Sequence, residues 1–184
     1  HPGIVPVYEA DIQDRQPYLV FEYVAGSTLE QWLKQRGKLE AKDAVALMME
    51  VLDAVAVAHG AGVIHRDLKP SNIIMDAAGR ARLMDFGIAA RIQGAGKNPV
   101  DSLGAGTVGY LSPEAANGEA PSPSMDIYSA GVVLAELMLG HALYGDQEAA
   151  RSVYRVLHEQ VELPQGVSID DSLRSILMRA LARD

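Results

Sequence analysis

Two short segments rich in Val, Ile, Tyr and Phe lie near the start of the chain. Residues 4–10 and residues 17–24 have the β-branched and aromatic content that is typical of strands. The polar residues 11–16 between them predict a hairpin loop. We therefore expect a two-stranded β-hairpin in this part of the chain.

Apolar positions then recur at helical spacing. Ser27 or Thr28 offers an N-cap for a short helix over residues 29–36, and a glycine follows that helix. A longer helix is predicted over residues 40–59, again followed by glycine. Its buried face is expected to contain the apolar residues at three-and-four spacing, which are Val45, Met48, Met49, Leu52, Val55 and Ala56.

The pattern changes after this helix. Short apolar pieces between polar turns predict small strands at 63–64, 72–75 and 81–84. Residues 93–106 contain four Gly and one Pro and predict a loop. Helical periodicity returns over three segments, 124–139, 147–158 and 171–182. A hairpin and small strands among mainly helical segments predict an α+β fold.

Composition narrows the possible classes of protein. The 184 residues include 16 Lys plus Arg and 24 Asp plus Glu, a net charge of −8, which argues against a nucleic-acid or anionic-membrane binder that needs a basic face. The absence of Cys excludes disulfides, a thiolate nucleophile and a Cys-ligated zinc site. The longest apolar stretch, residues 130–139, is too short to span a membrane.

Three motifs carry the chemical information. His-Arg-Asp-Leu-Lys-Pro-Ser-Asn occupies residues 65–72, Asp-Phe-Gly begins at Asp85, eighteen residues after Asp67, and Gly-Thr-x-x-Tyr-x-x-Pro-Glu occupies residues 106–114. A lone Asp-Phe-Gly is weak evidence, but the three motifs in this order and spacing are specific. Together they resemble the catalytic loop, metal-binding turn and Ala-Pro-Glu-type segment of eukaryotic-like serine/threonine protein kinases. The Lys-Pro-Ser-Asn and Leu-Ser-Pro-Glu stretches resemble the bacterial members of this family.

The resemblance implies a protein-kinase-like fold and transfer of the γ-phosphate of ATP to Ser or Thr hydroxyls of protein substrates. Asp67 would orient or accept the proton of the attacking hydroxyl, and Lys69 would face the transferred phosphate. Asn72 and Asp85 would hold Mg²⁺, or Mn²⁺, through hard oxygen ligands. Thr107 matches the threonine that bonds to the catalytic Asp and Lys in this branch.

The resemblance also locates a nucleotide pocket. Phe21 matches the gatekeeper position, the backbone of Glu22 and Val24 would pair with the adenine edge, and Ile74 and Met84 would form an apolar floor beneath the ring. The complete set of expected ATP-binding residues is Phe21, Glu22, Val24, Lys69, Ser71, Asn72, Ile74, Met84 and Asp85.

Supporting and regulatory roles are implied for a few further residues. His65 would pack under Phe86 and is not expected to be a base or a metal ligand, and Asp126 would brace the backbone of the catalytic loop. Structural or exposed positions are expected for His59, His141 and His158. Ser102 is a candidate autophosphorylation site whose phosphate would pair with Arg66, or else a solvated loop serine.

By resemblance, residues 1–24 are the end of a small lobe and a hinge, and residues 25–184 are the large lobe with an activation segment at 85–114. The family's Gly-rich loop, its V-A-I-K-type lysine and the helix with the partner glutamate have no counterpart here. We therefore expect a piece of a longer domain with very low activity alone. Glu114 is expected to pair with an arginine beyond Asp184.

Two other functions remain open. One is a pseudokinase or non-catalytic binding module, which would not need Asp67, Lys69, Asn72, Asp85 and Thr107 all intact. The other is a small-molecule phosphotransferase, against which Lys69 and the Gly-Thr-x-x-Tyr-x-x-Pro-Glu segment argue. We expect ATP and protein substrates as partners, no nucleic acid, and a cytoplasmic location, with a membrane anchor elsewhere in the full-length protein still possible. The oligomeric state is left open.

Overall fold

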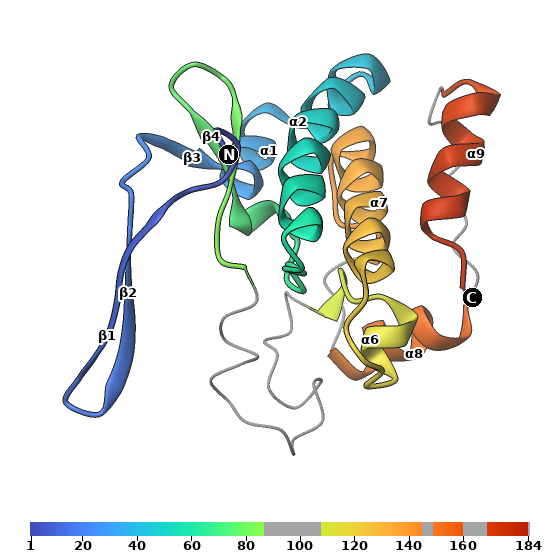
Figure 1. Ribbon diagram of the computed structural model, residues 1–184. Helices are drawn as coiled ribbons and strands as arrows, with labels where there is room; N and C mark the ends of the chain where they lie inside the picture. The colour runs from blue at the N-terminus through green and yellow to red at the C-terminus, as the bar shows by residue number, and fades with distance from the viewer. Residues whose placement is uncertain (87–107, 145–148, 160–168, 184) are drawn as a thin grey trace.

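Three of the helices lie together on one side of the strands. The computed structural model describes residues 1–86, 108–144, 149–159 and 169–183. Helices α2 (Ala41–Gly60), α7 (Pro123–Leu139) and α9 (Asp171–Ala180) lie side by side, with α7 in contact with both of the others, and the strands lie beyond α2 (Figure 1). This arrangement confirms the predicted α+β class.

The hairpin has a shorter loop than the sequence predicts, and its two strands lie closer to the turn than the predicted ranges 4–10 and 17–24. Strand β1 (Val7–Gln13) pairs antiparallel with β2 (Gln16–Phe21), and Gln13 lies opposite Gln16. The loop is therefore Asp14 and Arg15 alone, both left-handed with φ of 51° and 65°, as a tight turn matched to strand twist requires. The predicted loop over 11–16 is wrong because β1 is exposed along its whole length, where polar residues suit a strand.

A second sheet lies next to α2. It contains β3 (Gly26–Thr28), β4 (Ile73–Asp76) and β5 (Ala81–Leu83) in the order β3-β4-β5, all antiparallel. The backbone of residues 3–5 continues this sheet, because Val5 N donates to Leu83 O at 2.9 Å. The two strands predicted near 72–75 and 81–84 are confirmed, β3 was not predicted, and residues 63–64 form no strand.

The backbones of β3 and β4 approach so closely at Gly26 that a side chain does not fit. A Cβ built on Gly26 would lie 2.1 Å from the carbonyl oxygen of Met75. We expect Gly26→Ala to lower the free energy of unfolding by about 1–3 kcal/mol, because a backbone atom cannot rotate away as a side chain can. Chemical denaturation would measure the change. Gly60→Ala is the matched control, since nothing lies within 4 Å of a Cβ there, and equal midpoints for the two variants would contradict the prediction.

The predicted short helix is present as α1 (Leu29–Arg36). The Thr28 hydroxyl accepts a hydrogen bond from Gln31 N at 3.2 Å, and the Gln31 side chain accepts one from Thr28 N at 3.2 Å. This reciprocal capping satisfies two backbone donors at the start of the helix. Gly37 ends the helix, so the predicted cap and stop are both confirmed.

The buried face of α2 differs from the predicted one. Met48 and Val55 are buried as expected, but Met49 is 61% exposed and Ala56 is also exposed. The residues that this helix buries are Ala44, Met48, Val51, Ala54, Val55 and Ala58. Because α2 is apolar around most of its circumference, contacts with α7 and β5 decide which side is buried, and spacing alone does not.

The later helices follow the prediction closely. Helix α7 starts one residue before the predicted range and ends at Leu139 as predicted, followed by Gly140, which caps it with a left-handed φ of 78°. Helices α8 (Ala149–His158) and α9 lie within the predicted ranges, and the four-residue helix α6 (Pro113–Ala116) was not predicted. No helix within the described ranges is long and apolar enough to cross a bilayer.

Candidate active site

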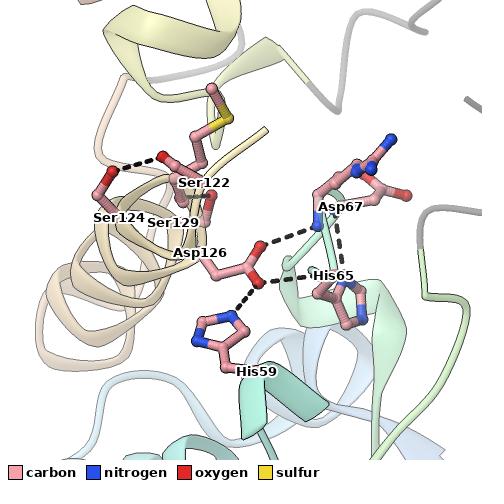
Figure 2. Close-up of polar contacts among 9 residues, drawn as sticks. His59, His65, Asp67, Ser122, Ser124, Asp126 and Ser129 are labelled. Atoms are coloured by element: carbon pink, nitrogen blue, oxygen red, sulfur yellow. Dashed lines mark hydrogen bonds and ion pairs between the residues drawn. The ribbon is translucent and has the colours of Figure 1, made fainter. Parts of the chain in front are cut away.

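The loop at residues 65–72 is fixed from below by a buried carboxylate on α7. Asp126 is 1% exposed, and its two oxygens accept hydrogen bonds from His65 N and Arg66 N, each at 2.8 Å (Figure 2). Arg66 has a φ of 67°, which costs a non-glycine residue energy and persists only where its surroundings enforce it. The predicted brace by Asp126 is therefore confirmed.

His59 is a third donor to the same carboxylate. Its Nε2 lies 2.7 Å from Asp126 Oδ2, so the last turn of α2 joins the start of α7 at this point (Figure 2). The sequence indicated only that His59 is structural or exposed. The specific contact was missed because its partner is 67 residues away and no local motif connects the two.

His65 connects the loop to the segment that contains Asp85. It is fully buried, Asp67 N donates to its Nδ1 at 3.2 Å, and its Nε2 donates to Met84 O at 3.0 Å. This pattern assigns a neutral ring with the proton on Nε2. Burial also favours the neutral ring, because it lowers the pKa of His65. The ring lies 4.6 Å from that of Phe86, centre to centre, which confirms the predicted packing.

Three of the predicted catalytic residues come together on this loop. Lys69 Nζ lies 2.9 Å from Asp67 Oδ2, and the amide nitrogen of Asn72 donates to the same oxygen at 2.9 Å and to Asp67 O at 2.8 Å. Asn72 is buried, whereas Asp67 and Lys69 are half-buried. The carboxylate is therefore held in one orientation by a cation and an amide.

Asp85 lies next to this cluster. Met84 N donates to Asn72 O at 3.0 Å, which joins the two segments, and Asp85 has a left-handed φ of 58°. Burial raises the pKa of Asp85, and the negative charge of Asp67 raises it further. A bound cation would relieve this crowding of negative charge.

The residues present fit Mg²⁺. The Asn72 amide nitrogen faces Asp67, which leaves the amide oxygen as the atom to bind a cation, and Asp85 supplies a second hard oxygen. In the described part of the chain, no three His, Asp or Glu side chains gather as a metal cage. A cation at Asn72 and Asp85 would thus keep positions for phosphate oxygens and water, as Mg²⁺ prefers.

The expected nucleotide-binding residues lie in two parts of the chain: residues 21–24 at the end of the hairpin, and residues 69–85, which include a 3₁₀ turn, β4 and β5. Ile74 in β4 is half-buried and so is Met84, which follows β5 directly, whereas Phe21 ends β2. The residues after it, 22–24, are the segment that the resemblance predicts to be the hinge; Glu22 N donates to Pro6 O at 2.9 Å. Ser71 lies in a single 3₁₀ turn, η1 (Pro70–Asn72). The roles of all these residues as ATP contacts stay predictions, and Ser102 and Thr107 lie outside the described residues.

A braced loop that brings a carboxylate, a lysine and an asparagine together beside a second carboxylate, on an α+β scaffold, is the arrangement that is typical of the protein kinase class. The chain belongs to the protein kinase domain family, whose sequence profile matches residues 1–184. Over its whole length it is 37% identical to the serine/threonine-protein kinase PrkC of Bacillus subtilis and 34% identical to the serine/threonine-protein kinase PknB of Mycobacterium tuberculosis. It spans 28% and 30% of those two proteins, respectively, which is less than a third of each.

Proposed function

We propose that this chain is the catalytic part of a serine/threonine protein kinase that uses ATP. The observation that carries the proposal is the contact of Asp67 Oδ2 with both Lys69 Nζ and Asn72 Nδ2, each at 2.9 Å. An orienting carboxylate next to a cation is what alignment and charge neutralisation of a phosphoryl group require. The names of the similar bacterial proteins support the same activity.

In the proposed reaction, the hydroxyl oxygen of a substrate Ser or Thr forms a bond to the γ-phosphorus of ATP while the bond to ADP breaks. Asp67 orients the hydroxyl and takes its proton, and Lys69 faces the negative charge on the transferred group. Asn72 and Asp85 hold Mg²⁺, which neutralises phosphate charge when bound. Because Lys69 and Asn72 both donate to one oxygen of Asp67, the orientation of the other oxygen is fixed as well.

The proposal includes a division of the chain at the hinge segment. Residues 1–24 belong to the end of the small lobe and the hinge, and residues 25–184 to the large lobe. The hinge backbone and the Ile74–Met84 floor would hold adenine between them. Protein substrates and a cytoplasmic catalytic region are part of this proposal.

A phosphotransfer assay on the purified full-length protein tests it. Incubation with γ-³²P-labelled ATP and Mg²⁺ is expected to label the protein itself or added casein on Ser or Thr, and chelation of Mg²⁺ is expected to stop the labelling. Phosphoamino-acid analysis would identify the labelled residue type. ATP binding with no transfer would instead indicate a pseudokinase, and transfer to small molecules alone would indicate another class of phosphotransferase.

A further inference from the structure

An ion pair joins the hinge segment to the sheet beneath it. Arg82, in the middle of β5, donates from Nη2 to Glu22 Oε2 at 3.2 Å. The Arg82 side chain is 14% exposed and that of Glu22 is 33% exposed, so the pair is mostly shielded from water and is screened less than a surface pair. The two residues are 60 positions apart and no sequence motif relates them.

The pair lies where two chain segments that flank the hairpin meet. Residues 3–5 run along β5 before β1, with Leu83 N donating to Gly3 O at 2.7 Å. Glu22 follows β2, and its backbone N donates to Pro6 O at 2.9 Å. Arg82 reaches the Glu22 carboxylate from the strand below, so the hinge is tied both to Pro6 and to β5.

Arg82 also belongs to the face of the sheet that is expected to lie under adenine. It is the direct cross-strand partner of Ile74, and such partners share a face. Met84 follows two residues later, which continues the same alternation. A shift of Arg82 toward or away from the hinge would therefore change the spacing between the floor and the hinge backbone.

The Arg82 side chain carries a local cost to stability. Its Nε is buried, and in the part of the chain that the structure describes this atom has no hydrogen-bond partner. An unsatisfied buried donor destabilises a fold. A local defect of this kind is expected where function, not stability, selects the side chain.

We propose that the Arg82–Glu22 ion pair is a positioning element for the purine nucleotide, which fixes the hinge backbone at the right height above Ile74 and Met84. Arg82 acts through the hinge and does not itself bind ATP. A hinge already held in its bound position loses less conformational freedom when the nucleotide binds. This inference rests on the proposed function, since it assigns how the same site recognises adenine.

Four variants of the full-length protein test the pair: Arg82→Gln, Glu22→Gln, the double variant, and Arg82→Lys. The probe is ATP or ADP with Mg²⁺, with Kd from calorimetry and KM and kcat from phosphotransfer. We expect each single Gln variant to raise the Kd and KM for nucleotide about fivefold, at the low end of typical coupling between sites, with a smaller change in kcat. The double variant is expected to match the single ones, because either substitution alone breaks the pair. Arg82→Lys is expected to retain most of the affinity.

Arg80→Gln is the matched control. Arg80 lies two residues away and also pairs with a carboxylate, that of Asp76 at 3.3 Å, but its side chain is 61% exposed. Its loss is expected to leave nucleotide affinity unchanged. Additive losses in the double variant, an unchanged Kd in Arg82→Gln, or equal losses in Arg80→Gln would each overturn the inference. Failure of the wild-type protein to bind ATP would instead overturn the proposed function, so the two failures are distinguishable.

Discussion

Replacing Asp67 with Asn in the full-length protein is expected to lower kcat by about 10²- to 10⁴-fold, the usual contribution of a positioned acid–base group. Asn has nearly the same shape, so the loop should keep its conformation. It lacks the negative charge, however, and cannot take the proton of the substrate hydroxyl. In the wild type, Lys69 Nζ and Asn72 Nδ2 both donate to one oxygen of the Asp67 carboxylate. The substituted amide would present either its oxygen or its nitrogen to these two donors.

Measurements of nucleotide affinity and thermal stability distinguish a loss of catalysis from a loss of folding in this variant. The Kd for ATP with Mg²⁺ and the melting temperature are expected to stay close to the wild-type values, because Asp67 is half-buried and belongs to no helix or strand. Asp53→Asn on the exposed side of α2 is the control for removal of one carboxylate, and its kcat should not change. Activity within threefold of the wild type in Asp67→Asn would refute the assignment of Asp67 as the residue that handles the proton.

The sequence was informative where function depends on neighbours along the chain. The octapeptide at 65–72 predicts that Asp67, Lys69 and Asn72 act together, and the structure brings their side chains into contact. Chain geometry explains this success, because a short loop with a 3₁₀ turn leaves few ways to separate residues two and five positions apart.

Contacts between distant segments were mostly not predictable. Asp126 was assigned its role only through resemblance, and His59 and the Arg82–Glu22 pair gave no signal at all. A lone histidine or arginine has the same local pattern whether it faces solvent or a carboxylate. Which of these occurs depends on packing of helices and strands that are 60 or more residues apart, and a single sequence does not record it.

Replacing Asp126 with Ala is expected to lower the free energy of unfolding of the catalytic region by about 3–5 kcal/mol, as is typical when one partner of a buried charged network is removed. The substitution leaves three donors without their acceptor: His65 N, Arg66 N and His59 Nε2. A buried donor without a partner costs about 1–3 kcal/mol, and water that enters the space would offset part of the sum. Asp126→Asn is expected to lose less, because its remaining oxygen can still accept from one of the backbone donors.

Hydrogen exchange of backbone amides locates the damage. In Asp126→Ala, the amides of His65 and Arg66 are expected to exchange much faster than in the wild type, because they lose their acceptor and the strained φ of Arg66 is no longer enforced. The Ala81 amide is the internal control, since it is bonded to the carboxylate of Glu50 at 2.9 Å, away from α7.

Uniform acceleration at all three amides would mean global unfolding. Unchanged exchange at His65 and Arg66 would show that the brace does not hold the loop. Selective acceleration, with kcat falling more than ATP affinity, is the result expected if Asp126 stabilises the conformation in which Asp67 works.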